Sequence, residues 1–384
     1  MSDEPDERVE EEKRDRIGDN LKAWFALHKR ELPWRGRGAY GVWISEIMLQ
    51  QTQVITVIPY YLRFMERFPT VEALASAPID DVLKHWAGLG YYARARNLHR
   101  AAQLIVEQHG GRLPDTPEDI ETLPGVGRYT AGAILSIAYN LPRPILDGNV
   151  IRVLSRVYGV TGNPKSTANQ KTLWTLAEKL VPAESPGDFN QAMMELGALI
   201  CNPADPKCER CPILQDCLAG NSADPSALPE TPPGKKAISV TMVSALVSNG
   251  KGEVLVVQRP PHGLWGGLWE FPRVTALSHE TPAEAALRGC RETVNLEMIA
   301  GEKLATVKHA VTHHAVTLHG VLGVPAFPGE LDTMKPLEGS AFRWLSLEAV
   351  DELALAAPQV ALKEALRHHF ERKGKGLVQH RLEL

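Results

Sequence analysis

The sequence predicts a multi-domain protein in which an all-α domain is followed by a smaller α+β domain. Three observations lead to this expectation. The chain has 384 residues, more than one ordinary hydrophobic core requires. Apolar residues recur at helical spacing in the first part of the chain, whereas β-prone apolar runs with turn signals follow in the second part. A segment rich in Pro, Ser and Gly separates the two parts.

The domain boundaries follow from these changes in pattern. We expect an acidic disordered tail over residues 1–16, a helical domain over 17–220, a linker over 221–237, an α+β domain over 238–370 and a polar tail over 371–384. The first sixteen residues carry eight acidic and four basic side chains, which account for the whole formal net charge of −4. The remainder is neutral, so any nucleic-acid site has to be a local feature.

The overall composition is that of an ordinary soluble globular protein, with 44% hydrophobic and 23% charged residues. No apolar run is long enough to cross a bilayer, and no secretory signal opens the chain. We therefore expect no membrane contact, and a monomer is adequate.

Helices are predicted wherever apolar residues recur every three to four positions, with Gly, Pro, Asn and Asp between the stretches. These stretches are Leu21–Leu27, Trp43–Val57, Val71–Leu83, Asn97–Val106, Ala131–Ile137, Val150–Val157 and Thr172–Leu180. Their succession indicates a compact all-helical domain.

The second part of the chain predicts strand pairs and two helices. An Asn-Gly-Lys-Gly turn signal joins the first two β-prone runs, which indicates a hairpin. The expected strands are Val240–Ser248, Glu253–Gln258, Val307–Val311 and Ala315–Val324, and the expected helices are Pro282–Arg291 and Leu347–Leu355.

Four of the five cysteines lie within one short polar loop, in the pattern Cys201-x6-Cys208-x2-Cys211-x5-Cys217. Four thiolates this close can converge on one metal centre and clip the end of the helical domain. Coordination chemistry alone leaves structural zinc and a 4Fe–4S cluster equally open. The remaining Cys290 is expected to be a small core residue.

The string from Leu123 to Gly132, LPGVGRYTAG, predicts a helix–hairpin–helix turn. Its glycines leave backbone N–H groups open to close approach, and the positive N-terminus of the next helix points at the same place. We expect Gly125, Val126 and Gly127 to contact a DNA backbone, with a plain helix connection as the alternative. Lys207 and Arg210 in the cysteine loop face a phosphate or form a solvated charge pair.

Glu46 is an acid in a strongly apolar helical run, Trp43–Val54. Desolvation there raises the pKa of a carboxyl group, and an acid that stays protonated near neutrality can donate a proton to a leaving group. The alternative is an ordinary exposed helix glutamate, because Gln50 and Gln53 share its side at helical spacing.

Asp147 is the second candidate acid, in the string ILDGNV. Read in isolation, an Asp before Gly, Asn and an apolar helix is an N-cap. A capping carboxylate can still face a substrate, where it can stabilise positive charge that develops on a sugar.

Together these strings resemble the MutY family of adenine DNA glycosylases. LPWR at Leu32–Arg35, the run around Glu46, GLGYYARARNLH at Gly88–His99, the hairpin, ILDGNV and the cysteine spacing occur in the family's order, densely over Leu21–Cys217. The resemblance implies a helix–hairpin–helix DNA glycosylase domain whose four cysteines hold a 4Fe–4S cluster. It also implies a nucleoid-associated, cytoplasmic protein of bacterial type.

The resemblance also implies roles for single residues. Glu46 resembles the general acid that protonates adenine at N7, and Asp147 the carboxylate that stabilises the oxocarbenium-like sugar, with Tyr129 and Asn149 beside them. The other matched positions are Arg35 and Gln191 near the adenine, and Gln51, Thr52, Leu89 and Tyr91 around 8-oxoguanine. The implied partner is double-stranded DNA with A·8-oxoguanine or A·G mispairs, which requires the target base to leave the stack.

Tyr129 separates this prediction from endonuclease III-like lyases, in which a lysine at this position attacks the sugar. A phenol cannot form a Schiff base, so we expect a monofunctional glycosylase. The alternatives are a thymine-mismatch glycosylase or endonuclease III-like lyase on the same scaffold, and a non-catalytic DNA damage sensor.

The C-terminal domain resembles a Nudix fold through the string QRPPHGLWGGLWEFP, Gln258–Pro272. Nudix hydrolases hold magnesium on a helix of glutamates, and the corresponding stretch Arg288–Thr293 lacks two of the three. We expect this domain to read the 8-oxoguanine strand instead. The family's recognition loop appears as Val311-Thr312-His313, in which Thr312 and His313 keep polar side chains while the aromatic residue is absent.

Overall fold

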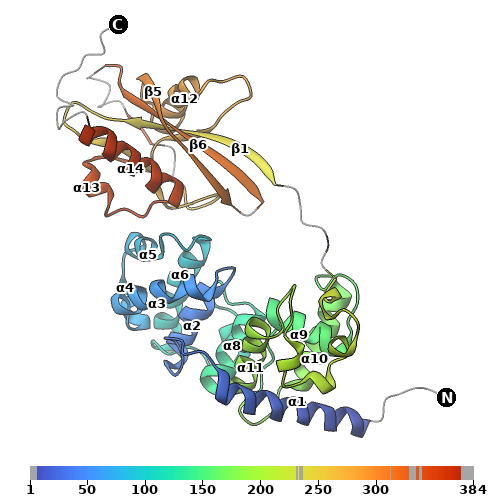
Figure 1. Ribbon diagram of the computed structural model, residues 1–384. Helices are drawn as coiled ribbons and strands as arrows, with labels where there is room; N and C mark the ends of the chain where they lie inside the picture. The colour runs from blue at the N-terminus through green and yellow to red at the C-terminus, as the bar shows by residue number, and fades with distance from the viewer. Residues whose placement is uncertain are drawn as a thin grey trace. The chain divides into compact units, whose positions relative to one another are not determined.

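The computed structural model describes residues 7–230, 232, 237–311, 313–327, 334–336 and 340–372. The chain divides into two compact units (Figure 1). The first comprises residues 1–76 and 97–233, and the second comprises residues 77–96 and 234–384. Among the described residues, no helix has both the length and the apolar character that a bilayer crossing requires.

The chain before residue 234 is helical, as its periodicity predicts. Its α-helices are α1 (Glu7–His28), α2 (Gly38–Leu49), α3 (Val54–Arg67), α4 (Val71–Ser76), α5 (Ile79–Trp86), α6 (Ala93–His109), α7 (Pro117–Ile120), α8 (Arg128–Tyr139), α9 (Gly148–Tyr158), α10 (Thr167–Leu180) and α11 (Pro186–Leu199). Short 3-10 turns follow at η1 (Cys208–Arg210), η2 (Leu214–Asp216), η3 (Ala219–Asn221) and η4 (Pro225–Ala227).

Two of the expected helices are each broken into two. The stretch Trp43–Val57 ends one helix at Leu49 and begins another at Val54, because Gln51 has a φ of 57°, which a right-handed helix cannot contain. The stretch Val71–Leu83 is interrupted before Ile79, where Pro78 holds extended backbone at the N-cap of α5. The apolar spacing runs through both breaks because the helices on each side have buried residues, such as Val57 in α3, Leu74 in α4 and Val82 in α5.

The expectation of a disordered tail over residues 1–16 is wrong for its second part, since α1 begins at Glu7. Tertiary contacts hold this polar half of the helix. Arg16 forms an ion pair with the buried Asp216, and Lys13 lies 4.6 Å from the ring centroid of Tyr158. Residues 1–6 lie outside the described residues.

The core of the first unit determines where its functional elements meet. Side chains of α1, α8, α9, α10 and α11 form one buried cluster that includes Leu21, Leu154, Phe189 and Leu196. Helix α2 packs against α8, and α11 packs against both α8 and α9, as the labels in Figure 1 show. These contacts bring α2, the start of α8 and the start of α9 to one place. Helix α11 is not among the helices that apolar spacing predicted.

The second unit contains two β-sheets. Its strands are β1 (Ile238–Val247), β2 (Val254–Gln258), β3 (Trp269–Glu270), β4 (Arg273–Thr275), β5 (Met298–Val311), β6 (His314–Pro325) and β7 (Ala341–Leu345). The larger sheet has the order β4-β1-β6-β5 and is mixed, because β1 runs parallel to β6 and antiparallel to β4. The smaller sheet has the order β3-β2-β7 and is antiparallel.

Helices cover both faces of the larger sheet. Alternate residues of β1 point to opposite faces. Val243 and Val247 share a buried cluster with Ala286 and Cys290 of α12 (Pro282–Val294), which confirms Cys290 as a core residue. Ser244, on the other face, accepts a hydrogen bond of 3.0 Å from Gln359 of α14 (Ala357–Arg372).

Two expectations for this unit need correction. Strands β1 and β2 are not a hairpin within one sheet, since a single antiparallel bridge between Ser248 and Val254 links them before they separate into different sheets. The expected helix Leu347–Leu355 is only the one-turn α13 (Leu347–Val350), and α14 follows it unpredicted. The strand pair β5–β6 and helix α12 are confirmed.

Candidate active site and iron–sulfur loop

A pocket of about 1000 Å³ lies among α2, α8, α9 and α11 of the first unit. Both candidate acids, Glu46 and Asp147, line it. Six further side chains singled out from the sequence line the same pocket, namely Arg35, Gln51, Thr52, Tyr129, Asn149 and Gln191. Residues from distant parts of the chain therefore meet at a single cavity.

Glu46 is buried, with 5% of its surface exposed, so it is not a solvated helix glutamate. Its Oε2 accepts a hydrogen bond of 2.7 Å from the hydroxyl of Tyr129. Burial raises the pKa of Glu46 to about 7, although the Tyr129 hydrogen bond opposes that rise. The negative charge of Asp147 adds to it. The raised pKa that the apolar sequence around Glu46 predicted is thus caused mainly by desolvation.

Asp147 both caps a helix and faces the pocket. Its Oδ1 accepts a hydrogen bond of 2.8 Å from the backbone N–H of Val150, and its Oδ2 accepts one of 3.0 Å from Nδ2 of Asn149. Burial raises the pKa of Asp147, while these donors stabilise its ionised form. The two interpretations of this residue from sequence are therefore compatible.

Arg152 was not identified from the sequence, although it holds Asn149 in place. Its Nη2 donates hydrogen bonds to Oδ1 of Asn149 at 2.9 Å and to the backbone oxygen of Gly197 at 2.7 Å. Its Nε donates to the backbone oxygen of Cys201 at 2.6 Å. The Arg152 guanidinium thus links the backbone of the cysteine loop to Asn149, which donates a hydrogen bond to Asp147. Its position three residues after Asn149 on one helix was the signal available in the sequence.

Arg35 and Gln191 contact each other at the other side of the pocket, where Nη1 of Arg35 donates to Oε1 of Gln191. Glu195, which lines the same pocket, accepts a hydrogen bond of 2.5 Å from Nη2 of Arg35. Sequence reasoning did not identify Glu195, although it follows Gln191 by four residues on one helix.

The residues expected around 8-oxoguanine fall in both units. Gln51 is exposed and Thr52 is partly buried, both at the rim of the pocket in the first unit. Leu89, Tyr91 and His313 belong to the second unit, where Leu89 is buried, Tyr91 is 41% exposed and His313 is exposed. Thr312 lies outside the described residues.

The loop that carries Tyr91 is braced by Arg94. The Arg94 guanidinium donates hydrogen bonds of 3.2 Å to the backbone oxygens of Leu89 and Gly90. It also lies 5.3 Å from the ring centroid of Trp86 and 5.5 Å from that of Tyr91. Tyr91 itself has a φ of 48°, an uncommon backbone conformation for a bulky residue. Arg94 thus contacts both the backbone of this loop and the Tyr91 ring, which stays partly exposed.

The hairpin between α7 and α8 contains the three residues expected to contact a DNA backbone. Gly125 has a φ of 82°, and both Gly125 and Gly127 are exposed while Val126 is buried. Among the described residues, no side chain caps the N-terminus of α8 at Gly127. Arg128, the first residue of α8, pairs with Glu178 and lies 3.9 Å from the ring centroid of Trp174.

The four cysteines Cys201, Cys208, Cys211 and Cys217 line one small pocket together with Arg156. Nη1 of the buried Arg156 donates to Sγ of Cys201 at 3.3 Å, and the backbone N–H of Gly220 donates to Sγ of Cys217 at 3.2 Å. Within the described part of the chain, no three His, Cys, Asp or Glu side chains meet the geometry for one metal ion. The donor set and the sulfur hydrogen bonds nevertheless suit a sulfur-ligated centre.

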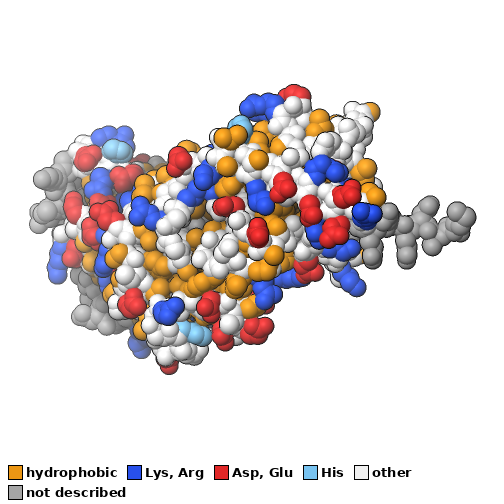
Figure 2. Space-filling view, turned by 90° about the horizontal axis from the view of Figure 1, so that it is seen from below, with side chains coloured by type: hydrophobic (Ala, Val, Ile, Leu, Met, Phe, Trp, Pro, Cys, Tyr) orange, Lys and Arg blue, Asp and Glu red, His pale blue; other side chains and the backbone are white. Residues whose placement is uncertain are grey.

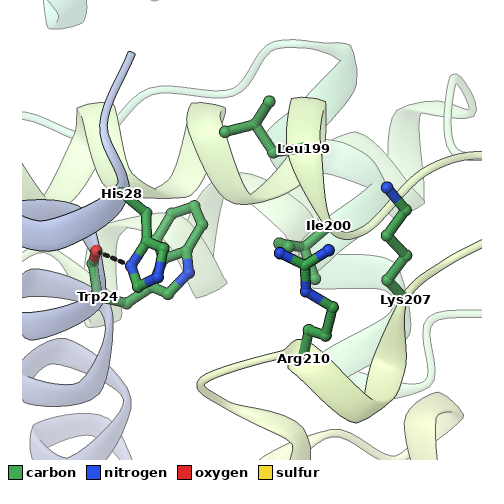
Figure 3. A pocket seen from close by; sticks show the side chains of 6 residues that line it. All are labelled: Trp24, His28, Leu199, Ile200, Lys207 and Arg210. Carbon is green, nitrogen blue, oxygen red and sulfur yellow. Dashed lines mark hydrogen bonds between the residues drawn. The ribbon is translucent and has the colours of Figure 1, made fainter.

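The basic side chains of the cysteine loop, Lys207 and Arg210, line another pocket of about 480 Å³. Figure 3 shows their side chains on one side of it and the ring pair of Trp24 and His28 on the other. These rings are stacked with centroids 5.6 Å apart, and Nδ1 of His28 contacts the backbone oxygen of Trp24 at 2.9 Å. A phosphate contact of Lys207 and Arg210 is a prediction from the sequence.

The face drawn in Figure 2 gives no broad charge signal for nucleic acid. Figure 2 shows acidic and basic side chains interspersed among hydrophobic ones on the face that it presents. This agrees with the near-neutral charge of the chain beyond its first residues. Any contact with DNA therefore depends on local features such as the hairpin.

Two family models match the chain. The HhH-GPD superfamily of base excision DNA repair proteins matches residues 44–179, which include Glu46, Tyr129 and Asp147. The NUDIX domain matches residues 243–365. Their succession agrees with a helical domain followed by an α+β domain with a Nudix-like fold.

Curated relatives and a solved structure agree with these matches. An adenine DNA glycosylase of Rattus norvegicus is 42% identical over 308 residues, which cover 67% of this chain and 60% of that protein. One of Buchnera aphidicola (Baizongia pistaciae) is 41% identical over 254 residues, covering 66% of this chain and 72% of that protein. A thermostable thymine-DNA glycosylase has a TM-score of 0.50 at 32% identity, over 54% of this chain and 97% of that one.

This chain spans about three fifths of the length of the rat and mouse relatives that it matches. Shared identity extends over most of the Buchnera protein, and both family models occur in the expected order. The chain therefore belongs to the adenine DNA glycosylase family, within the HhH-GPD superfamily of base excision DNA repair proteins.

Proposed function

We propose that this protein is a monofunctional DNA glycosylase that hydrolyses the N-glycosidic bond of adenine mispaired with 8-oxoguanine or guanine. One observation carries the proposal: a buried glutamate whose pKa is raised to about 7 shares a pocket with a hydrogen-bonded aspartate. Two carboxyl groups in different environments are the requirement for acid catalysis and charge stabilisation at one sugar.

Glu46 acts as the general acid. In its protonated form it donates a proton to N7 of the extruded adenine, so the base leaves with the electron pair of the glycosidic bond. The phenol of Tyr129 donates to Oε2, which orients the carboxyl group and stabilises the carboxylate that remains after the transfer. The ionised Glu46 then accepts a proton from the water that adds to the sugar.

Asp147 stabilises the positive charge that develops at C1′ as the base leaves. Its carboxylate is fixed by Asn149 and by the N-terminus of α9, and Asn149 is fixed in turn by Arg152. This support holds the charge in place before the reaction starts, which is the condition for effective electrostatic stabilisation. Tyr129 supplies no amine, so the abasic product stays uncut.

The contacts with the lesion and with the DNA backbone are part of the proposal. Gly125, Val126 and Gly127 approach the phosphates, where the uncapped helix N-terminus favours an anion. Tyr91 wedges beside the orphan base, and its exposed ring on a braced loop supports this role. The other lesion contacts are Gln51, Thr52, Leu89, His313 and Thr312.

We further propose that Cys201, Cys208, Cys211 and Cys217 hold a 4Fe–4S cluster. Bound there, the cluster would fix the loop that follows α11 and with it Arg152, which donates to the backbone oxygen of Cys201. Arg156 and the Gly220 N–H donate to two of the ligand sulfurs. In this arrangement the cysteine loop supports the pocket.

The test is excision on duplexes that carry adenine opposite 8-oxoguanine, adenine opposite guanine, and thymine opposite guanine. We expect release of adenine from the first two duplexes and an intact strand until hot alkali is added. Thymine release would instead favour the activity named for the solved relative. Strand cleavage at the turnover rate, with an adduct trapped by borohydride, would show a lyase. Tight binding of the mispair without any base release would show a damage sensor.

A further inference from the structure

Glu195 is a buried carboxylate in the pocket to which the proposed mechanism gives no role. Its side chain is 4% exposed, and its two oxygens accept hydrogen bonds from different arginines. Oε2 accepts from Nε of Arg30 at 2.8 Å, and Oε1 accepts from Nη2 of Arg35 at 2.5 Å. A buried charge with two charged donors is a fixed feature, because its removal leaves cations without compensation.

Arg35 is held from several directions at once. Its Nε donates to the backbone oxygen of Arg30 at 2.9 Å, and its guanidinium carbon lies 5.0 Å from the ring centroid of Phe25. Burial lowers the pKa of Arg35, and the charge of Glu195 opposes this effect. Glu195 is thus one of the groups that stabilise this desolvated cation.

The position of Arg35 fixes the orientation of the Gln191 amide. An arginine has only donors, so Arg35 Nη1 requires the oxygen Oε1 of Gln191. The backbone oxygen of Gly187 only accepts, so it requires the Gln191 amide nitrogen, which donates to it at 3.2 Å. With both ends occupied, the amide cannot turn over without the loss of a hydrogen bond at each end.

We propose that Glu195 is a positioning residue for base selection. It acts through Arg35 to hold the Gln191 amide in one orientation. The fixed amide then selects a 6-amino purine over a 6-oxo purine. Position 6 of adenine carries a hydrogen-bond donor, whereas the same position of guanine or hypoxanthine carries an acceptor. An amide held in one orientation turns the same end toward a bound base, and the selection of a 6-amino purine requires that end to be the oxygen Oε1. A base that carries an acceptor at position 6 then leaves buried polar groups unpaired. The inference rests on the proposed glycosylase function.

The test compares two bases in one enzyme. Glu195→Gln removes the charge and keeps the shape, and kcat/KM is measured for duplexes with adenine or hypoxanthine opposite 8-oxoguanine. We expect the ratio of hypoxanthine release to adenine release to rise at least about tenfold, the factor that corresponds to one hydrogen bond. Asp188→Asn, which removes an exposed charge from the same helix, is the matched control and should leave the ratio unchanged.

A purely structural role for Glu195 predicts a different result, because partial unfolding lowers both rates by the same factor. An unchanged ratio in a folded Glu195→Gln protein overturns the inference. If that variant does not fold, Arg35→Lys keeps a cation beside Glu195 but cannot donate to Glu195 and Gln191 from a planar fork, so the same ratio has to rise.

Failure of the proposed function is visible separately. A wild-type protein that releases neither adenine nor hypoxanthine removes both proposals. If the wild type releases adenine but the variants have the same ratio of hypoxanthine to adenine release, only the proposed role of Glu195 is wrong.

Discussion

The phenolic oxygen of Tyr129 lies 2.7 Å from Oε2 of Glu46 and donates a hydrogen bond to it. Helix packing brings the two residues together, since Glu46 is on α2 and Tyr129 is in the first turn of α8. The same phenol lies 3.5 Å from Sδ of Met194 on α11. Burial raises the pKa of Glu46, and the hydrogen bond from Tyr129 limits that rise, so the pKa is about 7. An acid with a pKa near neutrality can both donate and accept a proton.

Replacement of Glu46 by Gln should abolish adenine release and change the pH dependence of stability. The pKa of Glu46 is raised in the folded protein from 4.5 to about 7, so the folded state binds more protons than the unfolded state between these values. The protonated Glu46 therefore stabilises the folded state fully below pH 4.5, and this stabilisation is lost as the pH rises through 7. By pH 8 the wild type loses roughly 3 kcal/mol that the Gln variant retains.

Urea unfolding of the full chain at pH 5 and pH 8 measures this difference. Glu178→Gln, at a side chain that is 49% exposed, is the control and should follow the wild type. Parallel loss of stability in Glu46→Gln and wild type would show that the pKa of Glu46 is not raised. Binding of the mispaired duplex should persist in the Glu46 variant.

Replacement of Tyr129 by Phe should move the alkaline limb of the activity profile to higher pH. The hydrogen bond from Tyr129 lowers the pKa of Glu46, so its loss lets burial raise that pKa further above 7. Single-turnover rates measured between pH 6 and pH 9 give the pH at which this alkaline limb lies. Tyr139→Phe removes a phenol from the same helix that donates to the backbone oxygen of Leu113, and it should leave the limb in place. A limb that moves toward lower pH contradicts the proposed interaction.

Two alanine substitutions in the hairpin should separate folding from DNA binding. At Gly125 the φ of 82° disfavours a side chain, and an added Cβ would lie 3.0 Å from Cβ of Asn97, so Gly125→Ala should destabilise the protein by about 1 kcal/mol or more. At Gly127 an added Cβ has no heavy atom within 4 Å, so Gly127→Ala should fold normally.

Both methyl groups lie where the backbone would approach phosphate, so both variants should bind duplex DNA more weakly. Thermal unfolding and binding titrations at several salt concentrations give the two quantities. Normal affinity in a folded Gly127→Ala protein would count against the hairpin as the backbone contact.

Replacement of Cys208 by Ser should lower the iron content and the stability of the protein, because one of four proposed ligands is lost. Iron analysis, the visible absorption of the cluster and thermal unfolding measure these effects. The control is Cys290→Ala, at a buried position in the other unit, which should keep the iron content of the wild type. Equal iron content in wild type and Cys208→Ser would remove Cys208 from the ligand set.

Sequence reasoning predicted candidate sites where chemistry is encoded locally. The spacing of four cysteines, the glycines of the hairpin and an acid in an apolar run each identify a kind of site from a few neighbouring residues. The same reasoning failed where a local pattern permits two outcomes. Apolar spacing alone does not reveal that Gln51 adopts a positive φ and divides a helix, or that β1 and β2 enter different sheets.

The class of each domain could be predicted from the chain alone, and so could Glu46 and Asp147 as candidate acids, because helical periodicity, desolvation and capping act over a few residues. The fold alone shows that both acids line one pocket, that Tyr129 donates to Glu46 and that Arg152 holds Asn149 beside Asp147. The physical reason is that hydrogen bonds between α2, α8, α9 and α11 depend on how whole helices pack, and no local pattern encodes that packing.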